Sequence, residues 1–195
     1  MNKLVLLAAA PLLALAGCRS AATEAPPLAG AKIGGPFALT DQDGRAFSSA
    51  SLAGRYPVIY FGYTFCPDVC PTDMQVLAKG LNAFAKSDPA RAARVQPIFI
   101  SVDPARDTPP VLKSFVRAFS PRLIGLTGSE AQIAAVAKSY ASPYQKQAPA
   151  PGASGYLMQH GTAAILFGPD GGPIALVPVD ADAAQVADTL AKWVR

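Results

Sequence analysis

The chain has 195 residues, of which 51% are hydrophobic and 15% are charged. These proportions suit one compact domain with an apolar core and exclude a disordered or low-complexity protein. The formal net charge is +4, but the basic side chains are scattered singly. The chain therefore lacks the clustered basic patch of a nucleic-acid-binding protein, and we expect no nucleic-acid partner.

The N-terminus has the pattern of an export signal. A single charge, Lys3, precedes an apolar run from Leu4 to Ala16 that is too short for a stable membrane-spanning helix. The run ends in Leu-Ala-Gly-Cys at residues 15–18, which is similar to a bacterial lipobox. This resemblance implies cleavage before Cys18 and attachment of lipid to its sulfur. The alternative is an ordinary signal peptide with a chance cysteine.

These features divide the chain into three parts. We expect residues 1–17 to be a lipoprotein signal peptide. Residues 18–35, rich in alanine, proline and glycine, are expected to be the lipidated cysteine and a flexible tether. Residues 36–195 are then the folded domain.

The domain is expected to begin with a hairpin, a buried strand and a helix. Residues 37–48 predict two short strands around a turn at Asp43-Gly44. Residues 56–63 form a continuous apolar run, which is typical of a strand covered on both faces. Further on, Thr72 and Gln75 have the spacing of a capping box, and apolar residues recur at helical intervals after them.

The rest of the domain alternates strands with helices. In chain order, these elements are a strand at 95–103, a helix at 108–119, a strand at 123–128, a helix opening at Ser129 and Gln132, two strands around Asp170-Gly171, and a closing helix with Val186, Leu190 and Trp193. This order predicts an α/β fold: a mostly parallel central sheet with helices on both faces and an N-terminal hairpin.

Two cysteines follow the first buried strand, where open α/β sheets form their sites. If Cys18 carries lipid, Cys66 and Cys70 are the only free thiols of the chain. The N-terminus of the following helix favours thiolate over thiol, and Pro67 and Pro71 stiffen the loop. The spacing of four residues lets both sulfurs converge on one point.

Three kinds of site fit this pair. A structural disulfide would close a small loop and cross-link nothing distant. A dithiol oxidoreductase usually has two residues between its cysteines rather than three. A metal site needs a third ligand, and the only histidine, His160, precedes a buried strand. In thioredoxin-like folds the loop before this strand packs against the cysteines and usually carries a cis-proline; here a histidine lies there instead, which favours the metal site.

Two thiolates and an imidazole suit copper or zinc. Soft thiolates select Cu(I), and Cu(II) accepts a mixed set of sulfur and nitrogen donors. A structural zinc site prefers a fourth ligand, for which the sequence offers no obvious candidate. Met158 could offer a thioether, although a methionine beside an apolar strand more often packs in the core.

Several segments together resemble the Sco/SenC family. They are "YFGYTFCPDVCPTDM" at 60–74, "VQPIFISVDPARDTPPVLKSFV" at 95–116, "LIGLTGSEAQIAAVAKSY" at 123–140 and the histidine before a late strand. The resemblance runs from about Phe37 to the last residue. It implies a thioredoxin-like fold, a membrane anchor, and copper binding for delivery to the CuA centre of cytochrome c oxidase.

The resemblance also assigns residues. It implies that Cys66, Cys70 and His160 are the copper ligands, and that Asp68 and Asp103 match acidic positions of the family whose roles stay open. The chain departs from the family where Gln-His-Gly at 159–161 replaces the common Asp-His-Ser, and where Phe65 replaces a frequent histidine. A carboxylate near a ligating imidazole tunes it, but neither change removes a ligand.

The resemblance implies a lipid-anchored copper chaperone in the bacterial cell envelope, facing the periplasm. The CuA-bearing oxidase subunit and other copper chaperones are the implied partners. The alternative is a thiol:disulfide oxidoreductase that reduces exported proteins. A docking module alone would leave the cysteines and the histidine unexplained. Because converging sulfurs lie within bonding reach, Cys66 and Cys70 are also expected to form a reversible disulfide without copper.

Overall fold

The computed structural model of the chain describes residues 24–149 and 155–195. The expected signal peptide and Cys18 lie outside these residues. The strands are β1 (Ala38–Asp41), β2 (Ala46–Ser48), β3 (Tyr56–Gly62), β4 (Val95–Ser101), β5 (Ile124–Thr127), β6 (Tyr144–Lys146), β7 (Met158–His160), β8 (Ala164–Phe167) and β9 (Pro173–Val177). The helices are η1 (Ser49–Leu52), α1 (Val69–Ser87), α2 (Pro89–Arg94), α3 (Pro109–Phe119), α4 (Glu130–Ser139) and α5 (Ala183–Trp193).

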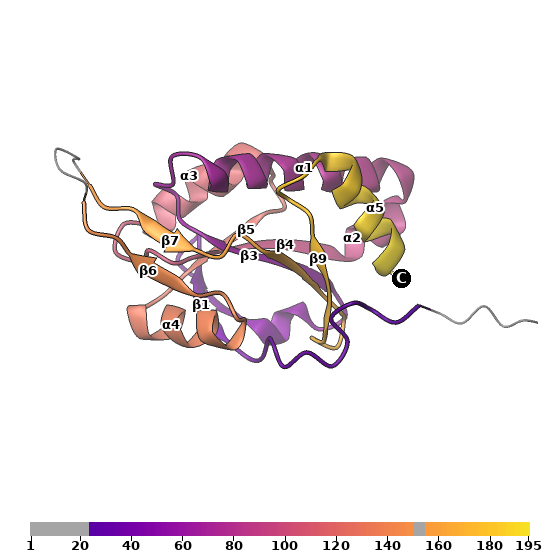
Figure 1. Cartoon of the computed structure of the whole chain (residues 1–195), viewed down its shortest axis with the longest axis horizontal. Helices are drawn as coiled ribbons and strands as arrows, with labels where there is room; N and C mark the ends of the chain where they lie inside the picture. Colours follow the sequence, from indigo (N-terminus) through magenta and orange to yellow (C-terminus); the bar gives the residue numbers. More distant parts are fainter. Residues whose placement is uncertain (1–23, 150–154) are drawn as a thin grey trace, which may run out of the picture.

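The central sheet confirms the predicted α/β class. Its order is β2-β1-β5-β4-β3-β8-β9, with α1, α3 and α5 over one face and α4 over the other (Figure 1). Parallel pairing is confined to β5, β4 and β3, so the sheet is mixed rather than mostly parallel. The reason is local: β1-β2 and β8-β9 are joined by tight turns with positive φ at Gly44 and Gly171, and such turns require antiparallel neighbours.

Several local sequence signals are confirmed. Strands β3 and β4 are buried at every position, as their apolar runs predict. Ser129 and Gln132 form the expected capping box of α4, and prolines occupy the first turn of α3. Helix α2 and the separate β6-β7 hairpin were not predicted. No helix in the described parts of the chain is long and apolar enough to cross a membrane.

The described part of the predicted tether packs against the domain. Leu28 donates its N–H to the carbonyl of Ile174 at 3.0 Å, and Gly34 donates to Ser139 at 2.8 Å. The side chains of Leu28 and Ile33 pack on the core. Burial of these apolar side chains accounts for the difference from the prediction of a flexible segment over residues 24–35.

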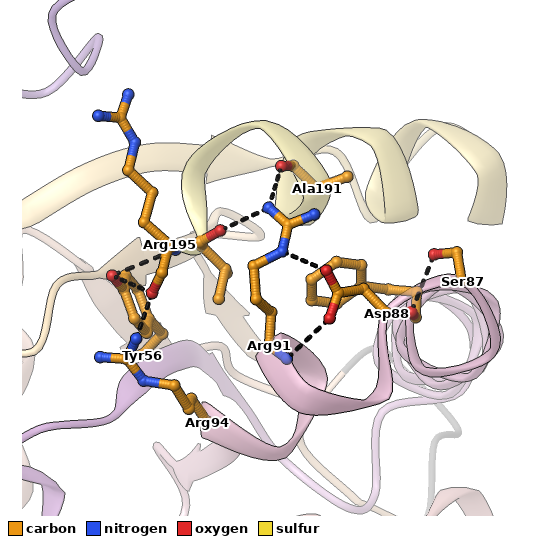
Figure 2. Close-up of polar contacts among 9 residues, drawn as sticks. Tyr56, Ser87, Asp88, Arg91, Arg94, Ala191 and Arg195 are labelled. Atoms are coloured by element: carbon orange, nitrogen blue, oxygen red, sulfur yellow. Dashed lines mark hydrogen bonds and ion pairs between the residues drawn. The ribbon is translucent and has the colours of Figure 1, made fainter.

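The closing helix α5 is fastened to α2 at the end of the molecule opposite the β6-β7 hairpin (Figures 1 and 2). Arg91 donates to the carbonyl of Ala191 at 2.9 Å and pairs with Asp88 at 2.5 Å. The hydroxyl of Tyr56 donates to the main-chain oxygen of Arg195 at 3.1 Å. These contacts hold the last residues of the chain against the start of β3.

Helices α1 and α5 pack closely at Gly80, so we expect a larger residue there to destabilise the fold. A Cβ on Gly80 would lie 2.4 Å from Cγ1 of Val186 and 3.0 Å from the carbonyl oxygen of Ala183. We expect Gly80→Ala to lower the free energy of unfolding by about 1–3 kcal/mol through overpacking, despite the better helix propensity of alanine. Urea denaturation measures the change. Val186→Ala should not rescue Gly80→Ala, because the Cβ at position 186 would itself lie 2.5 Å from the added Cβ. An undiminished unfolding free energy in Gly80→Ala would contradict this packing.

Candidate metal centre

Helix α1 begins earlier than the sequence predicts, and this places the second cysteine inside the helix. The expected capping box at Thr72 is wrong: α1 has Asp68 as its N-cap residue, and the Thr72 hydroxyl donates to the Asp68 carbonyl at 3.0 Å. The helix can start there because Pro71 lies in the first turn, where no N–H is needed. Cys70 therefore lies in the first turn of α1, and Cys66 lies in the loop before it.

The structure brings the three predicted ligands together. One donor atom each from Cys66, Cys70 and His160 lies within 4.8 Å of the other two. The Cys70 Sγ is 3.2 Å from Nε2 of His160, and the Cys70 N–H points at the Cys66 Sγ at 3.5 Å. Cys70 is buried, while Cys66 and His160 are partly exposed. The donors thus form one cluster that is covered on the side of Cys70 and opens to solvent on the side of Cys66 and His160.

A glycine makes room for the buried sulfur. Gly62 is the last residue of β3, and a Cβ at this position would lie 2.9 Å from the Cys70 Sγ and 2.9 Å from the ring of Phe99. Any larger residue would push the sulfur away from its place beside His160. The close approach of strand and helix at the cluster therefore depends on Gly62.

The orientation of the imidazole follows from its hydrogen bonds. Nδ1 of His160 lies 3.0 Å from the carbonyl oxygen of Gly161. Because a carbonyl only accepts, Nδ1 carries the proton, and Nε2 turns its lone pair toward Cys70. The ring packs edge-on against Tyr60 and Tyr63, with centroids 6.2 Å and 5.7 Å away. A main-chain carbonyl thus performs the orienting role that the sequence comparison assigns to a neighbouring carboxylate.

Burial dominates the electrostatics of the cluster. Desolvation raises the pKa of the Cys70 thiol, and the neighbouring Cys66 raises it further. At Cys70 this desolvation outweighs the helix N-terminus, which would otherwise favour the thiolate. Cys70 is therefore a thiol at neutral pH without metal, and a metal must displace its proton.

A buried carboxyl and phenol lie behind the cluster. The Tyr60 hydroxyl donates to Asp73 at 2.7 Å, and both side chains are buried. Burial raises the pKa of Asp73. Sequence reasoning missed this pair, although an aspartate on the apolar face of a predicted helix, three residues after Cys70, is itself a signal of a buried polar contact.

The raised pKa of Asp73 gives a prediction for stability against pH. Folding disfavours the ionised carboxyl, so the stability it contributes is complete below the unfolded pKa of about 3.9 and is lost as pH rises through the higher folded value. Asp73→Asn carries no charge and can still accept from Tyr60. We expect this variant to unfold at a higher urea concentration than wild type at pH 7, with the difference shrinking below about pH 4.

A matched control separates the effect of burying the carboxyl from the effect of removing one negative charge. Asp188→Asn removes an exposed carboxylate from α5 and should leave the urea midpoint nearly unchanged at both pH values. A lower urea midpoint for Asp73→Asn than for wild type at pH 7 would contradict the cost of burying the ionised form.

The acidic residues near the cluster differ in burial and in their hydrogen-bond partners. Asp68 is exposed beside the cluster, while Asp103 is buried and binds Arg106 and Tyr156 rather than a cysteine. Sequence reasoning missed Asp107, which is fully buried and accepts from both the N–H and the hydroxyl of Thr64, at 3.0 Å and 2.6 Å. Asp107 therefore anchors the loop just before Cys66.

An open cavity of about 460 Å³ lies in front of the donors. Three of its lining side chains are Cys66, Val69 and Leu157, and both Val69 and Leu157 are strongly exposed for apolar residues. Met158 also lines the cavity but is buried and packs with the core, as expected for a methionine beside an apolar strand. The cluster is thus reachable from outside through an apolar rim.

The comparisons with known proteins identify the relatives of this site. The SCO1/SenC family model matches residues 25–195. The chain belongs to the SCO1/SenC family. Protein SenC from Rhodobacter capsulatus is 40% identical over 162 residues, which cover 83% of this chain and 71% of SenC. The structure of ScoI from Bradyrhizobium japonicum with copper bound is 40% identical, has a TM-score of 0.73, and is matched over 83% of this chain and 99% of that one.

More distant structures extend the likeness. BsSco, a member of the Sco family of cytochrome c oxidase assembly proteins with an identified disulfide switch, is 25% identical with a TM-score of 0.58, over 86% of this chain and 97% of that one. A thioredoxin domain of a thiol-disulfide oxidoreductase from Bacteroides vulgatus, 17% identical with a TM-score of 0.57, shows the fold alone, over 84% of this chain and 96% of that one. The predicted thioredoxin-like fold is confirmed.

The chain matches only part of the length of its curated relatives. This chain spans 51%, 71% and 45% of the length of three curated relatives that it matches. Copper, the predicted metal, is the metal that solved Sco relatives hold, and the donors of this chain lie close enough together to bind one ion. Two sulfurs and one imidazole nitrogen suit both oxidation states of copper.

Proposed function

We propose that this SCO1/SenC protein is a copper chaperone that delivers copper to the CuA centre during cytochrome c oxidase assembly. The observation that carries the proposal is the convergence of Cys66, Cys70 and His160 within 4.8 Å at the mouth of an open cavity. The copper-bound structure of ScoI and the oxidase-assembly role of the family of BsSco support it. The CuA-bearing oxidase subunit and other copper chaperones are the proposed partners.

The different exposure of the two sulfurs suits transfer of a cargo ion. Cys70 is buried and its thiol proton must leave before it can bind metal, whereas Cys66 lies at the solvent side of the cluster. An incoming thiolate from the partner would replace Cys66 first, through the apolar cavity, while Cys70 still holds the ion. The acceptor receives copper without its release into solvent.

A transfer assay tests this function. Protein loaded with one Cu(I) is mixed, in at least twofold excess, with a soluble CuA-bearing domain whose cysteines are reduced, and the copper content of that domain is measured over time after the two proteins are separated. We expect the domain to gain copper faster from the loaded protein than from the same concentration of free or chelated copper. Equal rates from loaded protein and chelated copper would refute the delivery function.

The runner-up function is a thiol:disulfide oxidoreductase. Two free cysteines at the mouth of a thioredoxin-like fold and the disulfide switch of BsSco favour it. Such an enzyme depends on both cysteines and tolerates the loss of His160. If His160→Ala binds copper as well as wild type while the dithiol efficiently reduces an exported disulfide substrate, the oxidoreductase replaces the chaperone as the function.

We also propose that Cys18 carries the lipid that anchors the protein in the bacterial cell envelope, facing the periplasm. The supporting observation is the lipobox pattern that ends at Cys18. We expect the mature protein to enter the detergent phase on phase separation with Triton X-114, and Cys18→Ser to block maturation. Recovery of a wild-type mature protein in the aqueous phase, starting downstream of Cys18, would contradict the anchor.

A further inference from the structure

Arg106 lies at the centre of a cluster that joins three parts of the chain beside the metal centre. Its guanidinium is 3.7 Å from the ring centroid of Tyr156 and 4.8 Å from that of Phe65. Nε pairs with Asp103 at 2.5 Å, and Nη1 donates to the main-chain oxygen of Tyr156 at 3.0 Å. One side chain thus contacts the cysteine loop, the segment after β4 and the hairpin that carries His160.

Tyr156 makes two further contacts in this cluster. Its hydroxyl donates to the second carboxylate oxygen of Asp103 at 2.8 Å. The ammonium of Lys146, on β6, lies 3.8 Å from the same ring centroid that Arg106 contacts. Two cations against one ring, with a hydrogen bond at its tip, fix the chain just before β7 begins.

Met158 and Tyr144 attach the hairpin to the core, and Tyr156 adds a contact just before β7 begins. Among the described strands, β6 and β7 pair only with each other, and they project past the end of the central sheet (Figure 1). An isolated two-stranded hairpin is at most marginally stable in water. Tyr156 precedes His160 by four residues, about 13 Å of extended chain, so the contact at Tyr156 sets the direction of the strand that presents the imidazole.

We propose that Arg106 is a positioning residue for His160. By fastening Tyr156 to Asp103, it holds the imidazole at its place beside the two thiols. This inference rests on the proposed copper-binding function. Arg106 also lies over the rings of Phe65 and Tyr63, but the cysteine loop has a second anchor in Asp107, which accepts two bonds from Thr64. The larger effect is therefore expected on the hairpin.

If Arg106 positions His160 more than the cysteines, its replacement should weaken Cu(II) binding more than Cu(I) binding. Cu(I) is satisfied by two thiolates, whereas Cu(II) gains from the nitrogen donor. We expect Arg106→Gln to weaken Cu(II) binding about 10- to 100-fold, the range found for groups that orient a ligand, and to weaken Cu(I) binding less than about threefold. Arg106→Lys should show a similar loss of Cu(II), because lysine keeps the charge but cannot donate to both partners in the same geometry.

A double-mutant cycle tests whether Arg106 acts through His160. In a His160→Ala background, Arg106→Gln should cause no further loss of Cu(II) affinity, because the ligand that it positions is gone. Tyr156→Phe, which removes only the hydroxyl bond to Asp103, should give a smaller loss in the same direction. It provides the same test if Arg106→Gln does not fold.

A second readout needs no copper. The chain has one histidine, so in tag-free protein its ring protons give unique NMR signals. Their shifts report the packing against Tyr60 and Tyr63. In Arg106→Gln these signals should broaden and move toward the values of the unfolded chain, while the Cys70 signals move less.

Arg91 offers a matched control. It also pairs with an aspartate three residues earlier at 2.5 Å, lies over a ring (Phe84, 5.5 Å) and donates to main-chain carbonyls (Figure 2). Its helix, α2, lies at the end of the molecule opposite the β6-β7 hairpin (Figure 1). Arg91→Gln should leave Cu(II) affinity and the histidine signals unchanged.

Three outcomes would overturn the inference: equal loss of Cu(I) and Cu(II), a further loss in the His160→Ala background, or histidine signals in Arg106→Gln that match wild type. Failure of wild type itself to bind copper would instead overturn the proposed function. In that case the NMR comparison would still decide the positioning role.

Discussion

Replacing either cysteine of the metal centre with serine is expected to abolish tight binding of both Cu(I) and Cu(II). Cys66 and Cys70 supply both soft donors of a three-donor cluster, and a serine hydroxyl is a poor ligand for Cu(I). We expect Cys66→Ser and Cys70→Ser each to weaken both ions more than about 100-fold, beyond the range found for groups that only orient a ligand. Competition with chelators of known affinity measures each oxidation state separately.

His160→Ala is expected to differ from the cysteine variants in its selectivity. Loss of the imidazole should weaken Cu(II) most, because two thiolates alone still satisfy Cu(I). Asp68→Asn, which changes an exposed residue between the two cysteines, should bind both ions as wild type does. Equal losses of the two ions in His160→Ala would contradict the ligand-softness argument, and a copper-binding Cys70→Ser variant would contradict the whole site.

Copper bound at this cluster should also stabilise the fold. An ion that binds the folded chain raises the free energy of unfolding in proportion to the logarithm of its concentration over the dissociation constant. At a free copper concentration of about 100 times that constant, the increase is about 2.7 kcal/mol. The thermal midpoint should therefore rise with copper in wild type and stay constant in Cys70→Ser, which gives a second measurement of the same interaction.

The parts of this fold that sequence predicts best are those in which local chemistry and tertiary context agree. The unbroken apolar runs of β3 and β4 and the Ser129 capping box of α4 appear where expected. The start of α1 was misplaced because Thr72 and Gln75 have capping spacing, whereas the helix extends back over Pro71. Because a proline fits the first turn of a helix as well as the residues before it, capping-box spacing alone does not determine where the helix begins.

Short elements and long-range polar contacts account for most of what was missed. Strands β6 and β7 have three residues each, too few for a periodic pattern, and α2 has six. Their positions depend on tertiary contacts. The Arg106–Tyr156 contact joins residues fifty positions apart, and nothing in either neighbourhood marks the partner.

The candidate site was more predictable than its surroundings. Cys66, Cys70 and His160 are residue types with specific metal chemistry. The cysteines follow β3 and the histidine precedes β8, and these two strands are neighbours in the central sheet. Asp73 and Asp107 act through burial and hydrogen bonds, which depend on packing that composition does not reveal. Burial also reversed the expected thiolate character of Cys70, because desolvation outweighs the helix N-terminus.

Oxidation of the cysteine pair is expected to release copper, and reduction to restore binding. The Cys66 and Cys70 sulfurs lie within 4.8 Å, so a small movement of the partly exposed Cys66 loop brings them to the 2.05 Å of a disulfide. Formation of the S–S bond uses both thiolate electron pairs that would bind the ion, so metal and disulfide exclude each other. With glutathione disulfide as oxidant, each protein disulfide formed yields two molecules of reduced glutathione.

The linkage is measured in a soluble form of the protein that starts after Cys18, in which Cys66 and Cys70 are the only thiols. Protein loaded with Cu(I) is treated with increasing glutathione disulfide without oxygen, and freed copper is captured by a chromogenic chelator while the remaining thiols are counted. Copper release should follow disulfide formation with one ion freed per disulfide, and dithiothreitol followed by fresh Cu(I) should restore full loading. Cys66→Ser added to this background cannot form the bond, so glutathione disulfide should produce no intramolecular disulfide in it. Copper that stays bound to the fully oxidised protein would show that the two cysteines are not the ligands, because a disulfide has no thiolate left to offer.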